Sequence, residues 1–238
     1  MNLVSLQFIT SDHYNKNLNT LVKLIKQTPA GSFILAPELC LNGYAYDRLD
    51  EAVIISAQAI PILKELSKNK TIALTMTTKS PRKHLNTLYI FHKGKIVHTQ
   101  SKHHLFVMND EKKYFKAGEL EDIKLINIDG LKVASLICFE IRYSELWTRI
   151  KGADIILVPA MWGELRKDHY ESLTKALAIS NQCFVIASDS ANKECAKGSG
   201  IITPFGEEFR DDTKELIQKD VDLKEIKKMR RYLNVGIK

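Results

Sequence analysis

Apolar and polar positions along the chain follow two kinds of pattern. Runs of roughly four to eight apolar or β-branched residues, bounded by Gly, Pro, Asn or Asp, predict strands. Such runs lie at residues 2–8, 33–36, 71–77, 86–92, 95–100, 123–128, 131–138, 155–158, 184–188 and 200–203. Apolar residues that recur at helical spacing predict helices near residues 18–25, 50–69, 142–152 and 167–182 and close to the C-terminus.

The connections between these elements favour sheets of mixed direction. Lys93-Gly94 and Asp129-Gly130 each join two predicted strands as a tight antiparallel hairpin. Helices separate most of the other strands. We therefore expect an α/β fold in which two mixed sheets lie in layers and are covered by helices. A polar segment without periodicity, residues 101–121, interrupts the pattern, and long loops of this kind are often functional.

Length and composition are those of one globular domain. The 238 residues are 45% hydrophobic and 26% charged, which supplies enough apolar material for a core and excludes a disordered or fibrous chain. The sequence contains no internal repeat, low-complexity segment or linker-like stretch. We therefore expect a single domain over residues 1–238.

The net charge of +7 is spread along the chain. The densest basic cluster lies between Lys224 and Arg231 in the predicted C-terminal helix and is typical of a solvated helix face. No stripe of interleaved aromatic residues and no known binding module accompanies it, so we expect no nucleic-acid partner. No apolar run approaches the roughly 20 residues that a membrane-spanning helix needs, so we expect no membrane partner.

The four cysteines, at positions 40, 138, 183 and 195, form no CxxC pair. That spacing predicts neither a disulfide framework nor a zinc ribbon. The first residues lack the charged and apolar regions of a signal peptide, and we predict a reducing, cytoplasmic location in which thiols stay free. The histidines form no HExxH motif and no Cys/His cluster, so we expect no metal.

Three polar side chains stand where predicted strands end. They are Glu38, Lys102 and Cys138. Ligands collect beyond the carboxyl ends of strands in open α/β sheets, so residues far apart in sequence can converge there. A carboxylate, an ammonium and a thiol together are the parts of a nucleophilic hydrolase. Glu38 would take the thiol proton of Cys138, and Lys102 would stabilise the anion that forms.

Spacing alone leaves other interpretations open. Free cysteines are among the most buried residues, so Cys138, which follows apolar or small residues, can be ordinary core. A Cys–His dyad is a second alternative, with His103, His104 or His169 as the base. A carboxylate directly after a buried strand is costly to desolvate without a partner, which favours a functional or ion-paired role for Glu38.

Three segments carry a pattern that can be compared with known families. They are Ala36-Pro37-Glu38-Leu39-Cys40-Leu41-Asn42-Gly43-Tyr44, Ser101-Lys102-His103-His104-Leu105-Phe106 and Leu136-Ile137-Cys138-Phe139-Glu140-Ile141-Arg142. In this order they resemble the glutamate, lysine and nucleophile motifs of the nitrilase superfamily, the carbon–nitrogen hydrolases with a Glu-Lys-Cys triad. The resemblance covers nearly the whole chain.

The resemblance implies an α-β-β-α sandwich of two mixed sheets flanked by helices, and a cofactor-free hydrolase of non-peptide C–N bonds. Cys138 is then the nucleophile that forms a thioester, Glu38 the general base and acid, and Lys102 the oxyanion stabiliser. Glu111 matches a second family glutamate that supports the lysine and the substrate. The expected partner is a small linear amide or N-carbamoyl amine, and the expected assembly is a homodimer or higher homo-oligomer.

Substrate contacts are expected from Tyr44, Phe139, Arg142 and Trp162. Arg142 can pair with a substrate carboxylate or hold the loop after the nucleophile. Phe139-Glu140 stands where amidase-like members commonly have Tyr-Asp, partway toward the aromatic-Glu pair of nitrile-cleaving members. Nitrile hydrolysis and acyl transfer on the same triad therefore remain alternatives, as does a non-catalytic binding protein of this fold.

Overall fold

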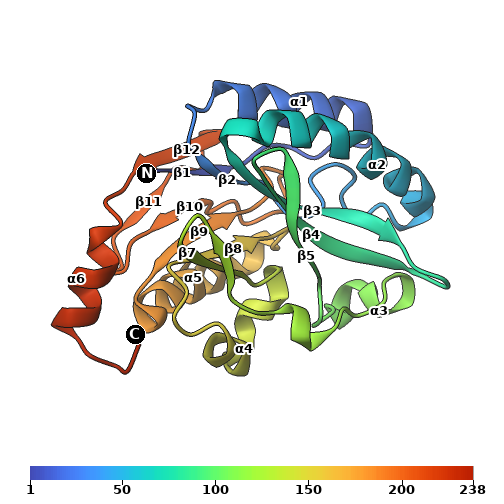
Figure 1. Cartoon of the computed structure of the whole chain (residues 1–238). Coiled ribbons are helices and arrows are strands. Elements are labelled where there is room, and N and C mark those ends of the chain that lie inside the picture. The colour runs from blue at the N-terminus through green and yellow to red at the C-terminus, as the bar shows by residue number, and fades with distance from the viewer. Residues whose placement is uncertain (238) are drawn as a thin grey trace.

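The computed structural model describes residues 1–237, in which two six-stranded sheets lie face to face with helices on both outer sides (Figure 1). Helices α1 (Tyr14–Gln27) and α2 (Leu49–Leu66) pack on the first sheet. Helices α4 (Ser144–Arg149), α5 (Lys167–Asn181) and α6 (Lys224–Tyr232) pack on the second. The α-β-β-α sandwich expected from the sequence is confirmed.

The first sheet has the strand order β12-β1-β2-β3-β4-β5. Its strands are β1 (Asn2–Leu6), β2 (Phe33–Leu35), β3 (Thr71–Lys79), β4 (His84–His92), β5 (Lys95–Ser101) and β12 (Leu216–Asp220). β1, β2 and β3 run parallel, β12 pairs antiparallel with β1, and β3, β4 and β5 form an antiparallel ladder. The hairpin predicted at Lys93-Gly94 is therefore correct.

The second sheet has the strand order β11-β10-β9-β8-β7-β6. Its strands are β6 (Ile126–Ile128), β7 (Leu131–Ser135), β8 (Ile155–Pro159), β9 (Phe184–Ser188), β10 (Gly200–Ile202) and β11 (Glu208–Arg210). β7, β8 and β9 run parallel, whereas the outer pairs are antiparallel. Both sheets are thus mixed, and each has a parallel centre whose carboxyl ends can carry a site.

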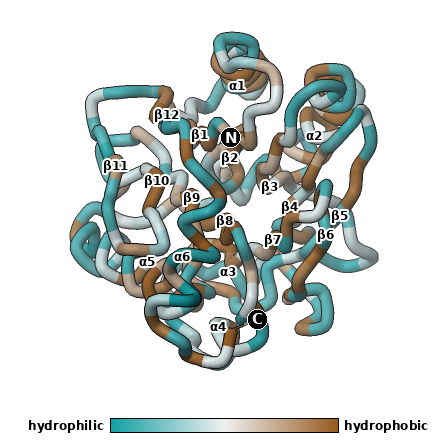
Figure 2. Tube along the Cα trace, turned by 60° about the vertical axis from the view of Figure 1, so that its left-hand side comes forward, coloured by the Kyte–Doolittle hydropathy of each residue, from teal (hydrophilic) through white to brown (hydrophobic). Residues whose placement is uncertain are grey.

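Apolar residues on both faces of the central strands account for their unbroken hydrophobic runs. In β2, Phe33 and Leu35 face the second sheet, and Ile34 faces α1 and α2. β8 and β9 are buried along their whole length. Figure 2 accordingly shows hydrophobic segments along the inner strands and hydrophilic segments along much of the outer loops.

Several predicted boundaries are wrong. The strand expected over 131–138 ends at Ser135, and the helix expected to begin near Arg142 is a 3₁₀ turn (Cys138–Arg142) followed by the six-residue α4. The loop over 101–121 contains the short helix α3 (Glu111–Tyr114). β11 and β12 were not predicted, because both are short and carry charged residues. No helix within residues 1–237 has the length and apolar character to span a membrane.

Candidate active site

Glu38, Lys102 and Cys138 meet at one end of the sandwich, as the strand-end pattern predicted. Glu38 lies just beyond β2, Lys102 directly follows β5, and Cys138 lies just beyond β7. Glu111, the first residue of α3, joins them from the loop after β5. The candidate site is therefore built from both sheets and from the loop that the sequence singled out.

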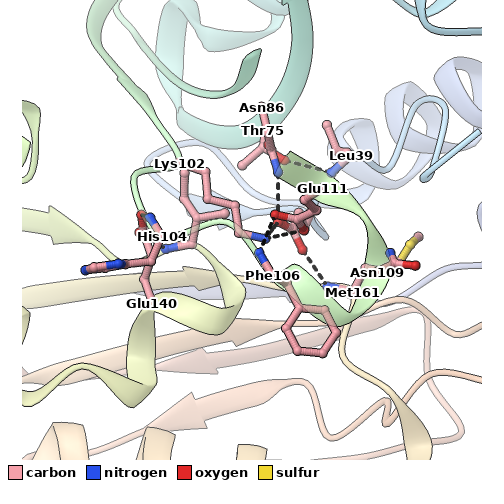
Figure 3. Close-up of polar contacts among 12 residues, drawn as sticks. Leu39, Thr75, Asn86, Lys102, His104, Phe106, Asn109, Glu111, Glu140 and Met161 are labelled. Carbon is pink, nitrogen blue, oxygen red and sulfur yellow. Dashed lines mark hydrogen bonds and ion pairs between the residues drawn. The ribbon is translucent and has the colours of Figure 1, made fainter. Parts of the chain in front are cut away.

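The ammonium group of Lys102 lies between two carboxylates. Lys102 Nζ is 2.8 Å from Glu38 Oε1 and 2.7 Å from Glu111 Oε1, and all three side chains are almost completely buried. Figure 3 shows Lys102 and Glu111 pointing toward each other. The hydroxyl of Tyr44 accepts a third hydrogen bond from Nζ at 3.2 Å. Burial by itself would lower the pKa of Lys102, but the two carboxylates outweigh it and raise that pKa, so the lysine is charged.

Neutral donors hold the two carboxylates in place. Asn86 Nδ2 donates to Glu38 Oε1 at 2.8 Å, and the Met161 backbone N–H donates to Glu38 Oε2 at 3.1 Å. The Phe106 backbone N–H donates to Glu111 Oε2 at 2.9 Å (Figure 3). Every carboxylate oxygen of the pair therefore has a partner, which fixes the orientation of both groups.

Cys138 occupies a strained backbone position. It is the first residue of the 3₁₀ turn and has a φ of 50°, in the left-handed region that costs a non-glycine residue on the order of 1–3 kcal/mol. The residue is 7% exposed. Burial and the charge of Glu38 raise its pKa, while Lys102 acts in the opposite direction. The thiol is therefore protonated at neutral pH and needs a base to become a thiolate.

Two cavities reach Cys138. The larger, of about 600 Å³, has walls that include Tyr44, Glu111 and Asn192. The smaller, of about 280 Å³, has aromatic and basic walls. Three of the predicted substrate contacts line this smaller cavity: Phe139, Arg142 and Trp162.

Residues that the sequence did not single out also line these cavities. Met161, just beyond β8, and Arg166, at the end of the following 3₁₀ turn (Glu164–Arg166), line both. Arg166 forms no salt bridge within residues 1–237, and neither does Arg142. The guanidinium of Arg142 lies over the Trp162 ring, 4.8 Å from its centre. The smaller cavity thus presents two guanidinium groups, neither paired with a carboxylate of the described residues, beside apolar walls.

The histidines considered as bases differ in position. His103 bonds through Nδ1 to the Gly118 carbonyl at 2.7 Å, and His104 stacks on Tyr143 with ring centres 3.7 Å apart. His169 lines the smaller cavity and contacts Arg142 at 3.1 Å. In the described part of the chain, no three His, Cys, Asp or Glu side chains are grouped as metal ligands.

Comparison with known proteins places this geometry in a family. The family model described as carbon-nitrogen hydrolase matches residues 9–231. The chain belongs to the carbon–nitrogen hydrolase family. Membership makes it an enzyme that hydrolyses C–N bonds, as the motifs predicted.

Individual relatives agree with the family match. The chain is 33% identical over 224 residues to a 2-oxoglutaramate amidase of Bacillus subtilis (strain 168), covering 88% of this chain and 85% of that one. It is 29% identical over 184 residues to the Omega-amidase YafV of Escherichia coli (strain K12), covering 73% and 70%. The structure of Saccharomyces cerevisiae Nit3, a nitrilase-superfamily member, matches with a TM-score of 0.86 at 23% identity, over 99% of this chain and 95% of that one.

Proposed function

We propose that the chain is an amidase that hydrolyses the monoamide of a short dicarboxylic acid through a thioester on Cys138. The observation that carries this proposal is the pairing of Lys102 with Glu38 and Glu111 next to a thiol that opens into two cavities. The names of the relatives agree with it, because 2-oxoglutaramate is itself the monoamide of a dicarboxylic acid.

The first half-reaction makes the thioester and releases ammonia. Glu38 takes the proton of Cys138 as the sulfur attacks the amide carbon, and the C–S bond forms. The carbonyl oxygen becomes an oxyanion, which the Lys102 ammonium stabilises. The C–N bond then breaks, and Glu38 returns its proton to the departing nitrogen.

The second half-reaction releases the acid. Water attacks the thioester carbon and gives a proton to Glu38. The C–S bond breaks, and Glu38 passes that proton to the departing sulfur, which restores the thiol and the free carboxylate. Glu111 keeps Lys102 in place throughout, because its second oxygen is fixed by the Phe106 N–H. Neither half-reaction needs a cofactor.

The two cavities suggest how the substrate is oriented. The larger one contains Tyr44 and Glu111, which surround Lys102, and we assign the amide nitrogen to that side. The smaller one offers apolar walls for a short acyl chain and the guanidinium groups of Arg142 and Arg166 for its far carboxylate. A neutral amide of equal length would leave both cations without a partner.

A comparison of matched amides tests this proposal. Ammonia release is measured with succinamate and glutaramate and with neutral aliphatic amides of equal chain length. We expect a higher kcat/KM for the acids, and we expect R166A to remove most of that preference while R48A, a surface arginine paired with Glu51, retains it. The C138A variant should be inactive with every amide. Equal rates for acids and neutral amides would contradict the dicarboxylate assignment, and an active C138A would contradict the nucleophile.

We also infer that the chain works in the cytoplasm as a homo-oligomer. Exposed apolar side chains on the outer side of the second layer support self-association, since Ile179 of α5 and the neighbouring Phe205 are 41% and 44% exposed. Analytical ultracentrifugation of wild type and I179K tests it. A monomeric wild type would contradict it.

A further inference from the structure

Glu140 is a fully buried carboxylate beside the candidate active site. Its Oε2 accepts the Ile137 backbone N–H at 2.7 Å, and its Oε1 accepts the His103 backbone N–H at 2.6 Å. Ile137 directly precedes Cys138, and His103 directly follows Lys102. One side chain therefore holds the backbone next to the thiol and the backbone next to the ammonium.

The two segments held by Glu140 come from different sheets. Lys102 follows β5, the outer strand of the first sheet, whereas Cys138 follows β7 of the second. Within residues 1–237 no strand pairing joins the two sheets, so contacts between the layers set the spacing of the two reactive groups; the Glu38 N–H, for example, donates to the Ala160 carbonyl at 3.1 Å. In Figure 3, Glu140 lies below His104, which follows Lys102 by two residues.

Stability alone does not account for this carboxylate. Glu140 forms no salt bridge within residues 1–237, and its hydrogen-bond donors are all backbone N–H groups. Burial raises the pKa of Glu140 to about 7, in spite of the N–H groups that favour the charged form. A buried carboxylate of this kind is expensive to desolvate. Its geometry provides a fixed link between two loops.

We propose that Glu140 is a positioning residue, which sets the distance between the Lys102 ammonium and the Cys138 thiol by accepting hydrogen bonds from the backbone beside each. It does not touch the substrate. The inference rests on the proposed function only in taking Cys138 as the nucleophile and Lys102 as the oxyanion partner. Amidase-like family members commonly have Tyr-Asp where this chain has Phe139-Glu140. Because glutamate is one methylene longer than aspartate, the carboxylate of Glu140 extends further from its backbone.

Two variants separate reach from hydrogen-bond acceptance. E140D keeps both oxygens but withdraws them by about 1.5 Å, so the carboxylate can no longer accept from both segments. E140Q keeps the length but turns an NH₂ group toward one of the two N–H donors. We expect both to lower kcat by about 10- to 100-fold with KM within about threefold of wild type, because the reacting groups are displaced while the cavities remain.

A second measurement needs no substrate and is independent of the substrate class. The rate of Cys138 alkylation by iodoacetamide is followed against pH, with the labelled peptide identified by mass spectrometry. Because the charge of Lys102 lowers the thiol pKa, moving Lys102 away should shift the alkylation midpoint to higher pH in both variants. A purely structural residue would not move this midpoint.

The matched control is D154N. Asp154 is also a largely buried carboxylate, and it joins the Lys132 backbone N–H to Arg230 of α6, away from the site. We expect D154N to lower the melting temperature while leaving kcat and the alkylation midpoint unchanged. If E140D and E140Q behave like D154N, the positioning role is wrong. If E140D fails to fold, E140Q alone decides whether Glu140 has a positioning role or a purely structural one. An active C138A would refute the proposed function, but it would not affect the alkylation result.

Discussion

Two lysines at opposite ends of β5 are each held by carboxylates, but in different surroundings. Lys93, in the β4–β5 turn, lies 2.6 Å from Asp129 in the β6–β7 turn, and their side chains are 64% and 56% exposed. Lys102, at the other end of β5, lies between Glu38 and Glu111 with no exposed surface. The same pairing of charges therefore occurs once in water and once in the interior.

The difference shows what each pair contributes. Water competes for the exposed charges and salt screens them. The Lys93–Asp129 pair therefore adds little to stability, and its residues can be replaced by others at little cost. The buried charges have no water to replace a missing partner, so removing one leaves the others uncompensated. A buried pair is also not the cheapest way to stabilise a core, since apolar residues of similar size often serve as well. We infer that the Lys102 group is retained for chemistry.

The largest effect is expected from E38Q. Glutamine keeps the size of Glu38 but cannot take the thiol proton, so kcat should fall by about 10²- to 10⁴-fold. The negative charge of Glu38 raises the pKa of Cys138, so its removal should shift the iodoacetamide alkylation midpoint to lower pH. Turnover and thiol ionisation should thus change in opposite senses. E65Q, an exposed glutamate paired with Lys68, is the control and should change neither. Near-normal turnover in E38Q would contradict the base assignment.

K102M should be next in size. Methionine keeps much of the length but removes the charge opposite the oxyanion, and kcat should fall by about 10²- to 10³-fold. Because Lys102 lowers the pKa of Cys138, its loss should move the alkylation midpoint to higher pH, opposite to E38Q. Denaturant unfolding should show a loss of about 3–5 kcal/mol, since two buried carboxylates lose their cation. A free energy of unfolding equal to that of wild type would contradict the burial of Lys102 with its two carboxylates.

Much of the catalytic end could be predicted from local signals. Glu38 and Cys138 are polar residues just beyond apolar runs typical of central parallel strands, whose carboxyl ends carry sites, and Lys102 follows the second strand of a predicted hairpin. β9 was predicted at its observed bounds, because it is buried on both faces and forms one continuous apolar run. These features depend on neighbours in the sequence, so the sequence displays them.

Other parts depend on partners distant in the chain. β12 has only alternate burial and charged residues, and its identity as a strand comes from pairing with β1, where Asn2 lies opposite Asp220. The Met161 and Phe106 groups that hold the carboxylates are backbone N–H donors, which leave no side-chain signal. Arg166 reaches the cavities from the end of a 3₁₀ turn that no periodicity marks.

A smaller effect is expected from G118A, which acts on Lys102 through the backbone. The Gly118 N–H donates to the Lys102 carbonyl at 2.8 Å, and a Cβ at this residue would lie 2.2 Å from the Ser101 carbonyl oxygen. The two segments must separate, so we expect a stability loss of about 1–3 kcal/mol and a roughly tenfold lower kcat. A117G alters the same segment without adding an atom and should retain kcat. Unchanged kcat in G118A would show that Lys102 keeps its position when its backbone moves.

The smallest effect is expected from K93A, at the exposed end of β5. We expect kcat to be unchanged and the melting temperature to fall by less than about 2 °C.

The hydrogen bond from Lys93 is the main cause of the lowered pKa of Asp129 in the folded protein. A lowered pKa means that this contribution is present above the ordinary aspartate range and disappears as pH falls through the folded value. Melting curves of wild type and K93A should therefore differ at pH 7, converge as pH falls below the ordinary aspartate range, and also converge in about 1 M salt. K102M should stay separated from wild type in the same salt, because its partners are shielded from ions. If salt removed the K102M difference as well, the contrast between the two ends of β5 would be wrong.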